Sequence, residues 1–457
     1  MSAHDVDVLI LGGGSGGYSC ALRADQLGLS VALVEEDKLG GTCLHRGCIP
    51  TKALLHTAEV ADAVRGSAHV GVTASLTGVD MPAALDYQRS VVAGLYGGLQ
   101  GLLKRAGIEI VSGRGQVVGP RTVEVEGRRI TGASLVLATG SYSRTIPGIE
   151  LGPRVLTSDS ALSLDRVPES VVVLGGGVIG IEFASIWASF GTKVTVVEAL
   201  DRIVPGEDEW SSKQLTKALR KRGIDIRTGT KVETVTESSD DVSVALSSGD
   251  TLTADLVLVS VGRGPRTDGL GLAEQGIATE RGFVTVDDNL LTTTDGTYAV
   301  GDIVAGYQLA HRGFQHGIFV AEHIAGLAPA RIDGDVVPRV TYSHPEVASV
   351  GLTEKAAEEK FGTVTSVVYD LGGNGKSRIL ATAGGVKVIR ARDDGPVVGV
   401  HLVGDRVGEL IGEAQLAVAW EALPSEVGSF VHAHPTQNEA LGEAMMVLSG
   451  RPLHAHS

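Results

Sequence analysis

Two stretches of the chain share the same order of apolar and polar residues. Residues 6–35 read VDVLILGGGSGGYSCALRADQLGLSVALVE, and residues 171–198 read VVVLGGGVIGIEFASIWASFGTKVTVVE. Each opens with an apolar strand, turns at glycines, continues as an amphipathic helix and ends in a second apolar strand. Their first glycines, Gly12 and Gly175, lie so far apart that the stretches are two separate β-α-β units and not repeats of a solenoid.

The segments that follow these units carry further helix and strand patterns. Residues 50–105 are predicted to be largely helical with a loop around 66–82, and short strands are expected over 108–138. The apolar run LVLVSVG at 256–262 closes the second unit. Residues 283–302 have a strand-turn-strand pattern that we expect to return to the first domain.

The C-terminal part has a different pattern. From Pro338 onward, alternating runs such as RVTYS, TSVVYD, GGVKVIRA and VVGVHLVG precede helices expected at about 407–420 and 436–449, which is typical of an antiparallel α+β domain. The predicted fold class is α/β, with two Rossmann-like dinucleotide-binding domains and a C-terminal α+β domain. The expected boundaries are 1–153 with 271–337 for the first domain, 154–270 for the second and 338–457 for the third.

The composition excludes some classes of function but adds little about the fold. A chain of 457 residues exceeds one ordinary domain, and 43% hydrophobic with 20% charged residues is typical of a soluble globular protein. The formal net charge of −15 argues against a nucleic-acid partner, which requires a basic face. No run reaches the roughly 18 apolar residues of a membrane span, and the N-terminus lacks a signal-peptide pattern. We therefore expect a cytoplasmic protein that binds neither nucleic acid nor membrane.

Each β-α-β unit carries a glycine motif suited to a dinucleotide. Gly12, Gly14 and Gly17 form G-x-G-x-x-G between a strand and a helix. The glycines allow a tight turn, close approach of a pyrophosphate and helix–strand packing, while the helix N-terminus offers free N–H groups to the anion. Glu35, at the end of the next strand, can accept hydrogen bonds from a ribose. The second unit repeats the arrangement with Gly175, Gly177, Gly180 and Glu198.

The carboxylate of Glu198 also bears on the choice of nicotinamide cofactor. A 2′-phosphate would meet a like charge there and requires a nearby arginine instead. Arg202 is close in sequence, which keeps NADP open, but the expected cofactor is NAD.

The segment GGTCLHRGCIPTKALLH holds two of the three cysteines. Four residues separate Cys43 from Cys48, and the residues after Cys48 are predicted to be helical. The pKa of a thiol near a helix N-terminus is lowered, so that the thiolate is favoured. Lys52, one turn later, can add positive charge. This pattern favours a redox-active pair.

Two alternatives to a redox pair stay open. A zinc ion could be bound by both cysteines with His45 or His56, although zinc needs four ligands and usually shows C-x-x-C spacing. An inert buried pair is the other alternative. Cys20, on an amphipathic helix, is expected to be a small core residue.

Further motifs accompany these in a fixed order, namely ATGS (138–141), TYAVGD ending at Asp302, LAHRG (309–313) and HAHPTQNE (432–439). With them the chain resembles the pyridine nucleotide-disulfide oxidoreductases from about residue 6 to 450, and within that family it is most similar to the dihydrolipoamide dehydrogenases. The resemblance implies FAD in the first unit, NAD in the second and a homodimer formed through the C-terminal domain.

A histidine near the C-terminus is a candidate base. A substrate thiol is mostly protonated at neutral pH, and an imidazole oriented by a carboxylate can remove its proton. The resemblance implies that His434 and Glu439 form this dyad and that the site is completed across the dimer. The His434–Pro435 bond is also a candidate for the cis form.

The resemblance assigns further residues to the cofactors. Lys52 and Glu182 would pair beside the flavin, and Asp302 would bind its ribitol. The other residues that would contact FAD or flank its ring are Gly115, Thr139, Gly140, Ser141, Gln308, Leu309, Ala310 and His311. Val232 and Gly262 would line the NAD site.

The chain also departs from the usual residues of this family. The departures are His45-Arg46 where Asn-Val is usual, Gln315-His316 where acidic residues are common, Arg266 where Asn is usual, and Gln437-Asn438. They leave the reaction type intact and bear on substrate preference and redox poise.

The predicted reaction is oxidation of dihydrolipoamide, carried on the lipoyl domains of acyltransferases in 2-oxoacid dehydrogenase-type complexes, with reduction of NAD. The alternatives are an NAD(P)H-dependent reductase of a mycothiol- or glutathione-type disulfide, an NADH:quinone or diaphorase-type flavoenzyme, and a non-catalytic docking protein. Glu198 argues against the glutathione type, and the presence of Cys43, Cys48 and His434 together argues against the last two. No metal is expected.

Overall fold

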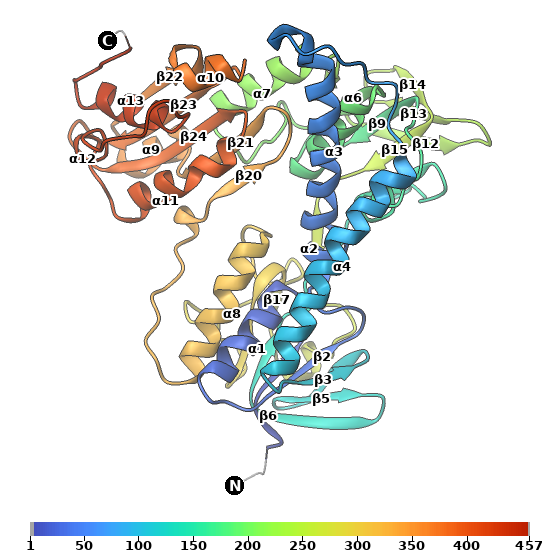
Figure 1. The fold of residues 1–457 in the computed structure, drawn as a ribbon. Helices are drawn as coiled ribbons and strands as arrows, with labels where there is room; N and C mark the ends of the chain where they lie inside the picture. The colour runs from blue at the N-terminus through green and yellow to red at the C-terminus, as the bar shows by residue number, and fades with distance from the viewer. Residues whose placement is uncertain (1–3, 456–457) are drawn as a thin grey trace.

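Two parallel sheets with matching strand order form the first two-thirds of the chain, in a computed structural model that describes residues 4–455 (Figure 1). The first sheet has the order β3-β2-β1-β6, and β19 pairs with the other edge of β6. Its parallel strands are β1 (Val6–Leu11), β2 (Val31–Glu35), β3 (Glu109–Ser112), β6 (Arg128–Leu137) and β19 (Thr297–Ala299). Of the segment 283–302, which was expected to return to the first domain, β19 pairs with β6 in the first sheet.

The second sheet repeats this order as β11-β10-β9-β15-β8, again with all pairs parallel. Its strands are β8 (Val155–Thr157), β9 (Ser170–Leu174), β10 (Lys193–Val197), β11 (Asp225–Arg227) and β15 (Leu256–Val259). Strands β9 and β15 consist almost entirely of apolar, buried residues, as expected for parallel strands covered on both faces.

Each parallel sheet is accompanied by an antiparallel meander. In the first unit, β4 (Gly115–Gly119) and β5 (Thr122–Val125) continue from β6. In the second unit, β12 (Val232–Glu237), β13 (Val242–Leu246) and β14 (Thr251–Ala254) form a separate three-stranded sheet. The similarity of the two units thus extends beyond the glycine motifs.

Glycines allow two helices to pack very closely on the first sheet. Helices α1 (Ser15–Gln26) and α8 (Ala310–Ile324) lie side by side in the lower part of Figure 1. A Cβ atom on Gly317 of α8 would lie 2.2 Å from the backbone oxygen of Gly16 in α1. This spacing excludes a side chain at that contact.

Helix α3 (Cys48–Gly66) connects the first unit to the second (Figure 1). Its buried residues Leu54 and Ala58 share a core with Phe183 of α6 (Val178–Phe190), the first helix of the second unit. The loop after α3 and helix α4 (Met81–Arg105) follow the sequence prediction closely. One end of α3 therefore lies at the first unit while its length packs against the second.

The C-terminal domain is a five-stranded antiparallel sheet in the order β20-β21-β24-β23-β22, covered by helices. The strands are β20 (Arg339–Thr341), β21 (Glu346–Gly351), β22 (Val364–Asp370), β23 (Gly385–Ala391) and β24 (Val397–Gly404). The two predicted helices are α11 (Ile411–Ala419) and α13 (Glu439–Leu448). Within residues 4–455, no helix has both the length and the apolar content that crossing a bilayer requires.

A buried polar cluster joins this domain to the second unit. Lys387 of β23 lies 2.7 Å from Asp208, whose side chain caps the N-terminus of α7 (Glu209–Lys221). Arg339 of β20 pairs with Glu207 at 3.3 Å, and both side chains are more than nine-tenths buried. Removing one partner of such a pair leaves an uncompensated buried charge.

We therefore expect Lys387→Met to lower the free energy of unfolding by about 3–5 kcal/mol, because Asp208 would lose its buried partner. Lys360→Met is the matched control: Lys360 pairs with Asp335 at 3.1 Å on the surface, and its loss should cost less than about 1 kcal/mol. Denaturant unfolding of the two variants measures the difference. Equal costs would contradict a stabilising role for the buried cluster.

Candidate active site

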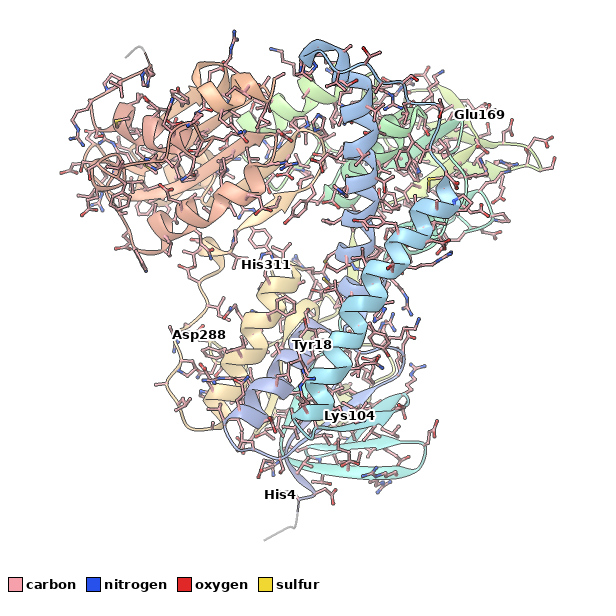
Figure 2. All side chains as sticks on the ribbon, viewed as in Figure 1. His4, Tyr18, Lys104, Glu169, Asp288 and His311 are labelled. Carbon is pink, nitrogen blue, oxygen red and sulfur yellow. The ribbon has the colours of Figure 1, made fainter. Side chains whose placement is uncertain are left out.

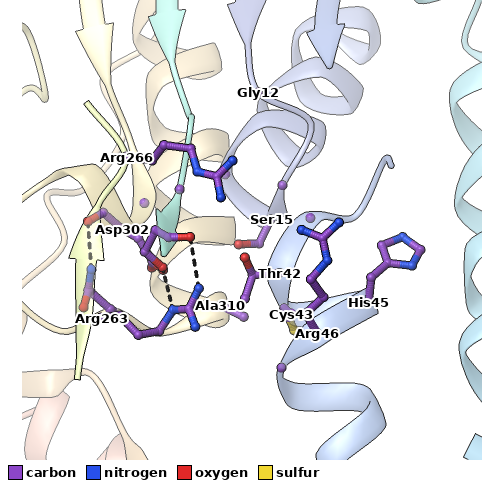
Figure 3. Close-up of a pocket in the computed structure, with 18 of the residues that line it drawn as sticks. Gly12, Ser15, Thr42, Cys43, His45, Arg46, Arg263, Arg266, Asp302 and Ala310 are labelled. Carbon is purple, nitrogen blue, oxygen red and sulfur yellow. Dashed lines mark hydrogen bonds between the residues drawn. The ribbon is translucent and has the colours of Figure 1, made fainter. Parts of the chain in front are cut away.

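A cavity of about 820 Å³ opens where the carboxyl ends of the first parallel sheet meet α3 (Figure 3). It is lined by the first glycine turn, by both cysteines of the predicted pair and by the start of α6. Its size is that of a typical cofactor site. The sequence-predicted residues on its walls are Gly12, Gly14, Glu35, Cys43, Cys48, Lys52, Gly115, Thr139, Gly140, Ser141, Glu182, Asp302, Gln308, Leu309, Ala310 and His311.

The first glycine turn has the geometry that a pyrophosphate requires. Gly12 has φ = 105°, and a Cβ atom there would lie 2.3 Å from the Ala138 oxygen; on Gly17 it would lie 1.8 Å from the Gly12 oxygen. Gly14, by contrast, faces open space on the cavity wall. Within residues 4–455, no side chain caps the N-terminus of α1, so its N–H groups can bind an anion.

The second glycine turn has nearly the same geometry. Gly175 has φ = 107°, and a Cβ atom on Gly180 would lie 2.1 Å from the Gly175 oxygen. Gly177 again faces open space. This turn does not line the large cavity; it lies at the N-terminus of α6, whose first residues do.

The two predicted ribose carboxylates occupy equivalent positions. Glu35 accepts a hydrogen bond of 2.6 Å from the Gly13 amide, and Glu198 accepts one of 2.6 Å from the Gly176 amide. Each carboxylate is thereby fixed beside its glycine turn. Arg202 was the residue considered as a partner for the 2′-phosphate of NADP. Its guanidinium donates to the backbone oxygen of Pro205 at 2.8 Å.

The cysteines lie on two consecutive helices. Cys43 is in α2 (Gly41–Arg46), a short helix that was not predicted from the sequence, and Cys48 is the first residue of α3. Gly47 separates the two helices. A hydrogen bond from the Cys43 thiol lowers the pKa of Cys48, against the effect of burial, and the charge of Lys52 lowers it further. The same hydrogen bond, together with burial, raises the pKa of Cys43. The arrangement favours a thiolate on Cys48 and a thiol on Cys43.

Lys52 and Glu182 form the predicted pair. Lys52 Nζ lies 2.9 and 2.8 Å from the two Glu182 oxygens, and the Glu182 side chain is almost fully buried. Burial lowers the pKa of Lys52, but Glu182 more than offsets this, so the lysine is held charged. The Tyr342 amide donates to Glu182 at 3.0 Å and its ring lies 4.7 Å from Lys52 Nζ. Tyr342, which comes from the C-terminal domain, was not predicted from the sequence.

Arg263 is a second residue of the cavity wall that was not predicted from the sequence. Its Nε donates to Ser141 at 2.8 Å, and Ser141 in turn donates to Asp302 at 2.5 Å, next to Arg263 in Figure 3. A basic residue directly after the glycine that ends LVLVSVG was the available signal. Asp302, the predicted ribitol residue, is thus held at the cavity wall.

The start of α8 faces the same cavity. Gln308 donates to the Asp302 carbonyl at 3.2 Å, and the first residues of the helix, Ala310 and His311, line the wall. Tyr18 of α1 lies nearby (both Tyr18 and His311 are labelled in Figure 2), and burial together with the two cysteines raises its pKa to about 12. The positive end of α8 is therefore directed at the place expected for the flavin.

The departure at His316 preserves the acceptor that an acidic residue would provide. Its Nδ1 accepts from the Gly301 amide at 3.3 Å, one residue before Asp302. Burial, with the charge of Arg312, lowers the pKa of His316 to about 3, so the imidazole is neutral.

The predicted His434–Glu439 dyad is formed, but away from the cysteines. His434 Nδ1 lies 2.9 Å from Glu439, and the Glu439 carboxylate also accepts from the Thr436 amide at 2.8 Å. Burial raises the pKa of Glu439, but these two hydrogen bonds outweigh it and lower the pKa overall. His434 is 78% exposed, and neither residue lines the cavity. The bond after His434 is cis as predicted, and His344–Pro345 is cis as well.

The remaining sequence-predicted residues are also outside the cavity. Val232 begins β12, and Gly262, with φ = 105°, accepts from the Arg144 amide at 3.0 Å. Among residues 4–455, His45 bonds to the Leu39 carbonyl and His56 to Glu59, and no cluster of metal-ligating side chains is found.

The cavity fits FAD by its own geometry. The uncapped N-terminus of α1 suits a diphosphate, Glu35 suits a ribose, and the far wall carries Cys48 and the start of α8. The second turn, with Glu198 fixed and Arg202 engaged elsewhere, has the features of a site for NAD.

Comparison with known proteins agrees with this geometry. Residues 6–317 match the family described as "Pyridine nucleotide-disulphide oxidoreductase", and residues 337–445 match its dimerisation domain. A dihydrolipoyl dehydrogenase of Bacillus subtilis (strain 168) is 42% identical, over 99% of this chain and 100% of the relative. A mitochondrial dihydrolipoyl dehydrogenase of Arabidopsis thaliana is 39% identical, over 98% of this chain and 91% of the relative.

The chain is also similar in fold to solved structures of flavoprotein disulfide reductases and related proteins. LpdA from Mycobacterium tuberculosis superimposes with a TM-score of 0.91 at 25% identity, covering 97% of this chain and 99% of that one. The HOCl-induced flavoprotein disulfide reductase RclA from Escherichia coli gives 0.87 at 28% identity, covering 96% and 99%. Matched by this family over most of its length, and by curated relatives over nearly all of it, the chain belongs to the pyridine nucleotide-disulphide oxidoreductases.

Proposed function

We propose that this protein is a dihydrolipoyl dehydrogenase, which oxidises dihydrolipoamide to lipoamide and reduces NAD⁺ to NADH with FAD as the resident cofactor. The observation that carries the proposal is the hydrogen-bonded pair Cys43 and Cys48 on the wall of a cavity that begins at a dinucleotide-binding turn. The full-length similarity to dihydrolipoyl dehydrogenases supports the choice of substrate. We assign FAD to residues 1–153 with 271–337, NAD to 154–270 and dimerisation to 338–457.

The chain's own residues prepare Cys48 to carry negative charge. Bound FAD supplies the two-electron chemistry that links a dithiol to a nicotinamide. Cys48 lies at the N-terminus of α3, and Lys52, one turn later, contributes the nearest positive charge. Glu182 holds that lysine in place and limits its net effect on the thiol.

Oxidation of the substrate occurs at Cys43. His434 takes a proton from one substrate thiol at Nε2, because Nδ1 donates to Glu439. The resulting thiolate attacks Sγ of Cys43 in the Cys43–Cys48 disulfide; the bond between the cysteines breaks and Cys48 leaves as a thiolate. The second substrate thiol then attacks the mixed disulfide, a cyclic disulfide is released, and Cys43 ends as a thiol. Two electrons have moved from the substrate to the cysteine pair.

A second copy of the chain would bring the base to the thiols. His434 is exposed and outside the cavity, so the dyad of one subunit is proposed to act on the cysteines of the other. The same region exposes large apolar side chains, Trp420 at 76%, Phe430 at 64% and Val431 at 101%. Such side chains in a domain that matches a dimerisation family favour burial against a partner.

The wider setting follows from this activity. We propose that the substrate is presented by lipoyl domains of a 2-oxoacid dehydrogenase-type complex in the cytoplasm. The second candidate, reduction of another small disulfide, is favoured by the similarity to the disulfide reductase RclA. Comparing the rates with dihydrolipoamide and with other thiols, each with NAD and NADP, separates the two candidates.

Cys43→Ser tests the disulfide mechanism. It should lower the rate of dihydrolipoamide oxidation by about 10³-fold or more, because no sulfur remains to accept the substrate. NADH–quinone activity, which bypasses the cysteines, should be retained. Cys20→Ala is the matched control, since Cys20 is a buried core residue outside the cavity. Unchanged dithiol oxidation in Cys43→Ser would refute the mechanism.

Lys52 and Glu182 should act on the Cys48 thiol in opposite directions. In the reduced protein, Lys52→Gln removes a charge that lowers the pKa of Cys48, so its titration should move to higher pH. Glu182→Gln removes a charge that raises this pKa, so the titration should move to lower pH. Ultraviolet thiolate absorbance followed against pH measures both. Shifts of the same sign would show that the charge of the pair does not act on Cys48.

His434→Gln tests the base. Loss of general-base catalysis should lower the rate of dihydrolipoamide oxidation by about 10²–10⁴-fold, while NADH–quinone activity, which needs no proton transfer from a substrate thiol, should be retained. His454→Gln is the control, because His454 forms a similar pair with Glu443 at 2.7 Å. Equal rates for the two variants would exclude His434 as the base.

A further inference from the structure

Two arginines from distant segments reach into the dinucleotide cavity and pair with consecutive acidic residues. Arg266 lies 2.7 Å from Glu36, and Arg46 pairs with Asp37. Glu36 and Asp37 directly follow Glu35, and all of these residues line the cavity. Figure 3 shows both guanidinium groups directed at the space in front of Ser15, the first residue of α1.

Hydrogen bonds fix the backbone of Arg266, and Arg46 belongs to a helix. The Arg266 amide donates to the Gly140 oxygen at 2.9 Å, and the Arg266 oxygen accepts from the Thr139 hydroxyl at 2.6 Å. Arg266 is therefore tied to a turn that lines the cavity. Arg46 is the last residue of α2, between the two cysteines.

The two arginines offset part of the negative charge on the cavity wall. Its lining contains six carboxylates and six lysine or arginine side chains, so the wall is neutral only with all six bases present. The carboxylates are Glu35, Glu36, Asp37, Glu182, Asp268 and Asp302, and the bases are Lys38, Arg46, Lys52, Arg114, Arg263 and Arg266. Without Arg46 and Arg266, an anionic diphosphate would enter a wall with an excess of negative charge.

Two of the other four bases are already held by neighbouring groups of the cavity wall. Lys52 is engaged by Glu182, and Arg263 by Ser141 and the Ser141 carbonyl. Arg46 and Arg266 remain about half exposed, each with a single carboxylate partner, near the N-terminus of α1 where a diphosphate binds. A planar guanidinium can bind a phosphate with two parallel hydrogen bonds.

We propose that Arg46 and Arg266 form a clasp that retains the adenosine diphosphate half of FAD, with Glu36 and Asp37 holding the guanidinium groups in position beforehand. The inference rests on the proposed FAD site of the first unit but not on the identity of the dithiol. Because Arg46 belongs to α2, the clasp also ties flavin retention to the segment that carries Cys43.

The test is the rate at which FAD leaves the holoenzyme, followed by the rise in flavin fluorescence, together with the Kd from reconstitution. Arg46→Gln and Arg266→Gln should each weaken FAD binding by about threefold to tenfold, and the double variant by about tenfold to a hundredfold, as expected for partly exposed charged contacts. Added salt should speed release less in the double variant than in the wild type, because fewer screened contacts remain.

The acidic partners separate direct binding from a structural ion pair. If the arginines bind FAD, Glu36→Gln and Asp37→Asn should weaken FAD binding less than Arg266→Gln and Arg46→Gln do, because the bases remain. Arg128→Gln is the matched control: Arg128 pairs with Glu109 at 2.8 Å in the same unit, is similarly exposed and lies outside the cavity. Its release rate should equal that of the wild type.

Equal effects from each arginine variant and its acidic partner would overturn the clasp and leave only structural ion pairs. Release rates equal to those of Arg128→Gln, or an unchanged salt dependence, would overturn it as well. These outcomes leave the proposed function intact, since wild-type flavin content and dihydrolipoamide turnover are measured separately. A wild-type protein that binds no flavin would overturn both.

Discussion

The interaction between the Cys43 and Cys48 thiols decides which of the two more readily carries negative charge. It makes Cys48 the stronger acid of the pair although burial acts in the opposite direction. Two other features support the same charge distribution, the N-terminus of α3 and the ammonium group of Lys52; the buried carboxylate of Glu182 keeps that ammonium charged but itself raises the pKa of Cys48. Each lies on a different part of the chain or a different turn, so the chemistry at Cys48 depends on the folding of both parallel units.

The two parallel units have the same glycine-turn geometry in different surroundings. In both, a glycine with positive φ ends the first strand, and a carboxylate accepts from the next amide at the same distance. The units differ in what surrounds the turn. The first turn lines the cavity that holds the cysteines. The second turn lies outside that cavity, at the N-terminus of α6, and α6 contributes Glu182 to the cavity wall. The repeated geometry therefore gives each unit a turn of the dinucleotide-binding type, and the helices that follow both turns line one cavity.

Local pattern was sufficient to predict much of this arrangement. The glycine turns, their carboxylates, the start of α3 at Cys48 and both major C-terminal helices depend on short-range sequence features, and the structure has them. Contacts between distant segments were not accessible in this way. Arg263 and Tyr342 reach the site only because strands far apart in sequence converge there. The short helix α2 was missed because three glycines, Gly40, Gly41 and Gly47, bound it and hide its helical pattern.

Helix α3 has a mechanical consequence. Its first residue is Cys48, and Asp62, near its other end, accepts from Ser189 of α6 and from Arg222 at the end of α7. Helix α3 thus joins Cys48 to the second unit, and its residue Glu59 also pairs with Arg406 of the C-terminal domain at 2.6 Å. The position of the cysteine pair is therefore coupled to the packing of α3 against the second unit.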